Sequence, residues 1–176
     1  VTIGGTYGEL PVPTMEGAGF GGWYTEKNGR GTEIFSTTEV TAEGDHTLYA
    51  RWVYAPNPNW GKDEVIKYGQ RSPAGFYGCQ VDSDYEWLFE WYRCDDRDRT
   101  NAVKAASASL NQAKFRTPAD LPVGEYYYYA TVTRIEEDGK SGTAVGPVVK
   151  VTVVPATPVY YESPDTIDIW LDKDNR

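Results

Sequence analysis

Along much of this chain, apolar and polar side chains alternate with a period of two, the pattern of a half-buried strand. In YEWLFEWYR, residues 85–93, the two tryptophans and the phenylalanine fall on one face, opposite Leu88, Glu90 and Tyr92. The runs GEYYYYATVTR (124–134) and GPVVKVTVV (146–154) alternate in the same way. The pattern therefore predicts three long strands in the second half of the chain.

Shorter extended runs separated by turns occupy the first 54 residues. In HTLYARWVY (46–54), Leu48, Ala50 and Trp52 share one face of an expected strand. The Asn-Gly pair in EKNGRG (26–31) predicts a tight turn, because both residues tolerate a positive φ.

Composition agrees with these patterns, since 14 Tyr and 6 Trp are interspersed with 18 Gly and 11 Pro among 176 residues. Aromatic runs punctuated by turn residues favour an all-β dominated fold. APNPNWGKDE (55–64) breaks the strand pattern and predicts a linker, in which Trp60 would be a wedge between two domains. We expect a module over 1–54, the linker over 55–64 and a β-sandwich over 65–154. Residues 155–176 form a strand-forming tail or the start of a next module.

The formal net charge of −9 disfavours nucleic acid and anionic membranes as partners, since both attract clustered Lys and Arg. No apolar run approaches the ~18 residues of a membrane span, so we expect no membrane insertion. Because the chain begins at Val1, we expect it to be a piece of a longer protein.

Enzymatic chemistry finds little support in the residue types present. The Gly-rich stretch GFGGWYTEKNGRG (19–31) lacks the following helix that a phosphate loop needs. His46 is the single histidine, and its position before a strand favours a structural role. In DDRDR (95–99), Arg97 and Arg99 are expected to pair with the neighbouring acids, with Ca²⁺ binding as the alternative. We expect no catalytic residue, no metal site and no cofactor.

GGTYGELPVPTMEGAGFGGWYTEKNGRGTEI, followed by HTLYARW, resembles the Listeria–Bacteroides repeat, also called the internalin B-repeat. The resemblance implies a small β-grasp-like module of bacterial surface proteins, with a stalk or adhesion role. In this module Phe20 and Trp23 would be core anchors. The landmarks that carry the resemblance are Gly5, Tyr7, Gly8, Leu10, Pro11, Pro13, Phe20, Gly22, Trp23, Tyr24, Leu48, Tyr49, Ala50 and Trp52.

Members of that family usually begin with one more strand, so the module resembles an N-terminally truncated repeat. The missing strand would leave open backbone groups, which can accept a strand from elsewhere. The expected strand at 166–172, from this chain or a neighbouring one, is our candidate, and this implies strand exchange between chains.

The second part resembles the bacterial Ig-like domains of surface proteins. FEWYRC (89–94) is similar to strand C with its core tryptophan, Trp91, and TPADLPVGEYYYYATVT (117–133) is similar to the corner that leads into strand F. Tyr128 matches the tyrosine-corner position of this family.

The cysteines depart from the Ig pattern. Cys79 matches the strand B cysteine, but Ala130 stands where the strand F cysteine is expected. The resemblance therefore leaves two alternatives for Cys79 and Cys94: a disulfide between them, or two buried thiols.

If strands C, F and G adjoin as in Ig domains, Tyr92, Tyr127, Tyr129, Glu90 and Lys150 form an outward patch. Such a patch is suited to stacking on a sugar ring or to an aromatic-anchored protein contact. The alternative is cross-strand aromatic pairing that stabilises a solvated sheet face.

Together these features favour a non-enzymatic segment of a bacterial secreted or cell-surface protein, acting outside the cell as a stalk or adhesion module. Its partner would be a host or cell-wall glycan or a protein ligand. The alternative function is a carbohydrate-binding accessory module of a secreted glycan-degrading enzyme.

Overall fold

The computed structural model of the chain describes residues 1–55, 61–72, 76–77, 84–111, 114–157, 159–163 and 166–170. The predicted all-β fold is confirmed, because the described elements are strands together with one short 3₁₀ turn, η1 (Lys27–Gly29). Cys79 and Trp60 lie outside the described residues. Across the described ranges, no helix has the length and apolar character needed to cross a membrane.

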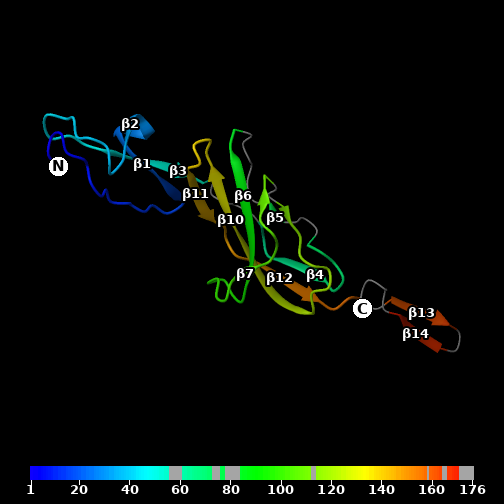
Figure 1. Cartoon of the computed structure of the whole chain (residues 1–176). Helices are drawn as coiled ribbons and strands as arrows, with labels where there is room; N and C mark the ends of the chain where they lie inside the picture. The colour runs from blue at the N-terminus through cyan, green and yellow to red at the C-terminus, as the bar shows by residue number, and fades with distance from the viewer. Residues whose placement is uncertain are drawn as a thin grey trace.

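The N-terminal module contains a three-stranded antiparallel sheet in the order β2-β1-β3 (Figure 1). Its strands are β1 (Ala18–Glu26), β2 (Arg30–Ile34) and β3 (Tyr49–Tyr54). The Asn-Gly turn predicted from the sequence joins β1 to β2, and Asn28 and Gly29 both have positive φ values, 62° and 70°. The hairpin turn thus forms at the two residues that tolerate a positive φ.

A break in the β1–β3 register between Phe20 and Trp23 puts these two residues, three apart in sequence, on one face of the sheet. Phe20 contacts both Trp23 and Trp52 edge to face, at centroid distances of 5.6 and 5.9 Å. The Trp23 indole donates a hydrogen bond to the Pro11 carbonyl oxygen (2.8 Å), which holds the N-terminal segment against the sheet. The expected anchors, Phe20 and Trp23, are half-buried. Burial is more complete at Tyr24, Ile34, Val40 and Val53.

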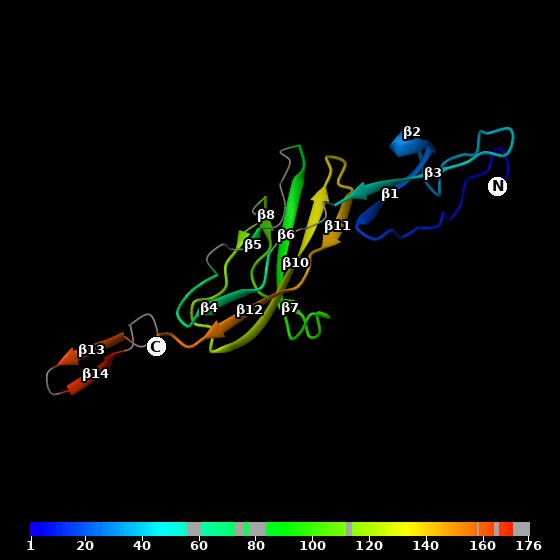
Figure 2. The same ribbon diagram turned by 180° about the vertical axis from the view of Figure 1, so that it is seen from behind.

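Residues 4–8 form backbone hydrogen bonds with residues 36–40, including Gly4 N–H to Val40 O (3.0 Å) and Gly8 N–H to Ser36 O (2.9 Å). The expectation that the 166–172 strand of this chain completes the N-terminal module is wrong. Instead β14 (Thr166–Trp170) pairs with β13 (Val159–Ser163) in a hairpin. Figures 1 and 2 both show this hairpin at the opposite end of the molecule from the N-terminal module.

A seven-stranded sheet forms the centre of the molecule, with the path β4-β12-β10-β6-β7. Off this path, β11 pairs with β10 and β8 pairs with β6, while β5 and β9 form a separate two-stranded sheet. The bounds are β4 (Glu64–Lys67), β5 (Phe76–Tyr77), β6 (Glu86–Cys94), β7 (Val103–Lys104), β8 (Ser109–Leu110), β9 (Lys114–Phe115), β10 (Gly124–Ile135), β11 (Ser141–Val145) and β12 (Val149–Val154).

The core lies on the face of this sheet that the alternation predicted. It contains Trp87, Phe89 and Trp91 of β6, together with alternate residues of β10 and β12. Phe115 of β9 stacks on Trp91 at 5.3 Å, so the small β5–β9 sheet packs over the core face of the large one. Tyr128, the residue expected at the tyrosine corner, is buried in this core. Tyr126 of the same strand donates a hydrogen bond from its hydroxyl back to the Pro122 carbonyl oxygen (2.9 Å), four residues earlier in the chain.

Two strands share one edge of β10. β12 pairs with residues 124–128 and β11 with residues 131–135, and Gly146 N–H continues the ladder to Ala130 O (2.8 Å). The β12 half of this edge carries β4, which runs parallel to β12. The β11 half lies beside the N-terminal module, as Figures 1 and 2 show.

Substitution of Trp23 by Ala tests the role of the indole in the N-terminal module. We expect a loss of about 2 kcal/mol in unfolding free energy, below the usual Trp→Ala cost because the ring is half-buried. Amide hydrogen exchange at Gly4 and Val40 should accelerate, since the indole fixes Pro11, which follows closely on the segment 4–8 that pairs with residues 36–40. Trp23→Phe, which keeps a ring beside Phe20, should lose less. Unchanged exchange in the Ala variant would contradict this role.

Candidate functional site

The five residues of the predicted surface patch do lie together on the outer face of the seven-stranded sheet. Tyr129 is directly opposite Tyr92, and Tyr127 is directly opposite Lys150, in the β10–β6 and β10–β12 ladders. Glu90 follows on the same face, opposite Thr131. All five side chains are half-buried. The predicted adjacency of the strands therefore holds, although the rings are less exposed than expected.

The two central tyrosines of the patch contact each other. Tyr92 and Tyr129 stack with a centroid distance of 5.0 Å and an interplanar angle of 12°. The Arg99 guanidinium lies over the Tyr129 ring at 5.3 Å. Burial raises the pKa of Tyr129. This geometry matches cross-strand aromatic pairing, the alternative that the sequence left open.

The charged members of the patch also have partners within the chain. Lys104 Nζ contacts a Glu90 carboxylate oxygen at 2.7 Å, and Lys150 Nζ contacts Glu125 at 2.8 Å. Glu125 also accepts a hydrogen bond from the Tyr127 hydroxyl (3.2 Å). A ligand at this face would have to compete with these contacts.

The expectation that Arg97 and Arg99 pair with the neighbouring acids of the loop at 95–99 is wrong. Arg97 forms a salt bridge with Asp63, and Arg99 donates to the Gly146 carbonyl oxygen (2.9 Å). Asp96 instead accepts backbone N–H groups from Asp98 and Thr100 at 2.9 and 3.0 Å. The Thr100 hydrogen bonds lower the pKa of Asp96. The loop is therefore closed by its own backbone, while its arginines reach toward β4 and β12.

Cys94 is buried at the end of β6. Its thiol lies 3.2 Å from the Asp96 carbonyl oxygen, and burial raises the pKa of that thiol. Cys79, the other half of the expected disulfide, lies outside the described residues.

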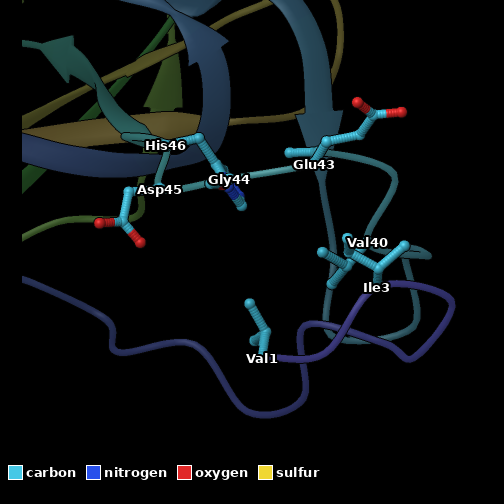
Figure 3. A pocket seen from close by; sticks show the side chains of 8 residues that line it. Val1, Ile3, Val40, Glu43, Gly44, Asp45 and His46 are labelled. Carbon is cyan, nitrogen blue, oxygen red and sulfur yellow. The ribbon is translucent and has the colours of Figure 1, made fainter.

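An open cleft of about 430 Å³ lies at the tip of the N-terminal module (Figure 3). In Figure 3, Val1, Ile3 and Val40 lie on one side of it, and the carboxylates of Glu43 and Asp45 point away from each other. His46 also lines this cleft. Its ring nitrogens lie 2.6 Å from the Tyr7 hydroxyl oxygen and 3.0 Å from the Gly44 carbonyl oxygen. Both nitrogens have partners, which agrees with the structural role expected for this histidine.

The backbones of the N-terminal module and of β11 approach each other closely. Gly19 and Val53 are paired residues of β1 and β3, and their backbone meets that of Ser141 and Gly142. A Cβ atom added at Gly142 would stand 1.8 Å from the Val53 carbonyl oxygen, and one added at Gly19 would stand 1.8 Å from the Ser141 carbonyl oxygen. We call this contact the glycine junction. It brings two backbones so close that neither position has room for a side chain.

Comparison with known families bears on the first part of the chain. Residues 1–51 match the Listeria-Bacteroides repeat domain. The resemblance stated for this module is thereby confirmed, whereas the match does not extend to the seven-stranded sheet and its Ig-like assignment. Searches of curated proteins and of solved structures gave no match to the chain.

Beside the glycine junction, Arg51 of the repeat binds the loop between β10 and β11. Its guanidinium forms salt bridges with Glu136 and with Asp138, the latter at 2.6 Å. Partial burial by itself would raise the pKa of Asp138, but hydrogen bonds from Arg51 and from the Lys140 backbone N–H outweigh this and lower it. The charged form of Asp138 is therefore the one that the junction stabilises.

A second cation crosses the junction in the opposite direction. Lys140 Nζ donates to the Tyr24 hydroxyl oxygen (2.7 Å) and to a Glu33 carboxylate oxygen (2.5 Å), both in the repeat. Burial by itself would lower the pKa of Lys140, but the hydrogen bonds to Glu33 and Tyr24 outweigh it and raise it. Each part of the chain thus supplies one cation to an anion of the other.

These junction residues were missed by sequence reasoning. The charged residues of the stretch RIEEDGKSG (134–142) give no indication in the sequence that Arg51 and Glu33 are their partners. A usable signal was present in β3, where Arg51 shares a strand face with fully buried Val53. A charged residue on a face that buries a valine indicates a partner on that side.

Substitution of Gly142 by Ala tests the glycine junction. Gly142 does not have a positive φ, so the added methyl acts through its clash with the Val53 backbone. We expect a loss of about 2–3 kcal/mol and separate unfolding of the repeat in chemical denaturation. Gly124→Ala in the same sheet is the control, because its Cβ would meet ordinary contacts at 3.7 Å or more. Equal stability of the two variants would exclude a tight junction.

The lowered pKa of Asp138 predicts a pH dependence. The contribution of this carboxylate is fully present above its ordinary pKa of 3.8 and is lost as the pH falls through the lowered value. Because Asp138 is partly exposed, we expect the Asp138→Asn cost at pH 7 to be below about 1 kcal/mol. The difference in melting temperature from wild type should shrink in acid. Glu137→Gln, the same change at the adjacent exposed acid, serves as the control, and a pH-independent Asp138→Asn difference would refute the assignment.

Proposed function

We propose that this chain is a non-enzymatic, modular segment of a bacterial secreted or cell-surface protein, in which it acts as a stalk or adhesion module. The family match over residues 1–51 supports the proposal, because the Listeria-Bacteroides repeat occurs in bacterial surface proteins. The same match supports a location outside the cell.

The observation that carries the proposal is the glycine junction. A spacer must keep its ends apart, which requires that successive modules do not hinge freely. Backbone contact at Gly19 and Gly142, with the salt bridges of Arg51 and Lys140 beside it, opposes such hinging. The repeat and the β13–β14 hairpin lie at opposite ends of the molecule, as a spacer requires (Figures 1 and 2).

An Ig-like assignment of the second module is part of the proposal. It is supported by the adjacency of β6, β10 and β12, which correspond to strands C, F and G, and by the small sheet packed over Trp91. Sandwiches of this type are common spacer units in extracellular proteins.

The alternative function, a carbohydrate-binding accessory module, depends on aromatic rings with free faces. Mutual stacking of Tyr92 and Tyr129, with Arg99 over the latter, favours the stalk role over this alternative. A host or cell-wall glycan, or a protein ligand, would on this account be held mainly by neighbouring parts of the parent protein.

Distance measurements between the two modules test the proposal. Spin labels attached through a non-cysteine amino acid at Glu43 and Val123, both exposed, should give one narrow distance distribution by double electron–electron resonance. The Gly142→Ala variant should broaden it, because the junction opens. A label pair at Val123 and Glu137, within the sandwich, is the control and should stay narrow in both proteins. A broad distribution in the wild-type chain would contradict a spacer role.

A further inference from the structure

The first and last strands of the seven-stranded sheet, β4 and β12, pair in parallel. Their ladder runs from Val151 opposite Glu64 to Val154 opposite Lys67. The chain enters β4 at Glu64 and leaves β12 at Val154, at opposite ends of this ladder. Tension on the two ends of the chain therefore pulls the strands past each other along their axes. In that direction the hydrogen bonds of the ladder are loaded together.

Antiparallel pairs in the same chain respond differently to tension. In the β13–β14 hairpin, the chain enters at Val159 and leaves at Trp170, which are directly opposite each other. In the repeat, Ala18 at the start of β1 is opposite Tyr54 at the end of β3. Tension at such a pair separates the strands one hydrogen-bonded rung at a time. These pairs should open at low force.

Additional contacts reinforce both ends of the β4–β12 ladder. At its start, Asp63 accepts the Lys150 backbone N–H (2.9 Å) and pairs with Arg97. At its end, Tyr68 N–H donates to the Val154 carbonyl oxygen (2.8 Å), and Lys67 Nζ donates to the Thr157 hydroxyl (2.5 Å).

The core shields the ladder from water on one side. Ile66 of β4 and Val151 and Val153 of β12 are buried in the hydrophobic cluster beneath it. Hydrogen bonds that water cannot readily replace are harder to break under load.

We infer that the β4–β12 ladder is a mechanical clamp that lets the sandwich carry tension along the chain. The inference rests on the proposed stalk function, since tension arises when one end of the parent protein is anchored and the other end holds a partner. In such a stalk, the load enters through the repeat and residues 55–63 and leaves through β12. The clamp is the element in this path whose hydrogen bonds must fail together.

Single-molecule pulling of the intact chain from its two termini tests the clamp. The sandwich should rupture in one event that releases 64–154, roughly 300 Å of extended chain. The comparison is the same protein pulled from the N-terminus and from a click-chemistry handle at exposed Pro147. There the force peels β4 from the start of β12, so rupture should occur at a severalfold lower force. Equal forces in the two geometries would overturn the inference, because overall stability is the same in both.

Two single substitutions distinguish an effect on the clamp from an effect on overall stability. Asp63 and Glu125 both accept a hydrogen bond from Lys150, but Asp63 links it to the start of β4, whereas Glu125 lies on β10. Asp63→Ala should lower the rupture force between the termini, and Glu125→Ala should leave it unchanged. An equal effect of both variants would also overturn the clamp.

Failure of the clamp and failure of the proposed function are distinguishable. A narrow inter-module distance with equal forces in both geometries would refute the clamp and leave the spacer intact. A broad inter-module distance with a strong direction dependence of the force would refute the rigid spacer and leave the clamp.

Discussion

The close approach of two backbones at Gly19 and Gly142 sets the arrangement of everything around it. Because no side chain separates the strands there, the repeat lies directly on β11, and Val53 at this contact is fully buried. The same approach brings Arg51 within reach of Glu136 and Asp138, and Lys140 within reach of Glu33. In a module of about 54 residues, which has little core of its own, a second buried face is a substantial part of its stability. The repeat and the sandwich are therefore better understood as one unit than as two modules on a flexible linker.

One edge of β10 pairs with both β11 and β12, and each of these strands contacts a further part of the chain. Its β11 half receives the repeat, and its β12 half receives β4 in parallel. The two arginines of the loop at 95–99 add to this edge, since Arg97 reaches Asp63 and Arg99 reaches Gly146. The outer face of the sheet is stabilised by stacked tyrosines and paired charges. The proposed β4–β12 clamp, the contact with the repeat and the solvated outer face thus all belong to one continuous sheet.

Local patterns of the sequence predicted the local structure well, and contacts between distant residues poorly. Alternation identified the buried faces of β6, β10 and β12, since period two follows directly from strand geometry. The Asn-Gly turn was equally predictable, because it depends on the two residues themselves. The glycine junction was not, since Gly19 and Gly142 are far apart in sequence and glycine carries no hydrophobic signal. The partners of Arg51, Arg97 and Lys140 were missed for the same reason, and the β13–β14 hairpin was missed because only one of its strands was recognised.

The central claim is that the backbones of the repeat and β11 are in direct contact. Nuclear Overhauser measurements on the intact protein test it most directly, because they detect protons only a few ångströms apart. A Cβ added at Gly142 would lie 2.9 Å from the Gly19 backbone nitrogen, so the α protons of Gly142 must lie near the Gly19 amide. Strong cross-peaks are expected between the backbone protons of these two glycines. Assigned spectra in which both residues are visible and no such cross-peak appears would contradict it.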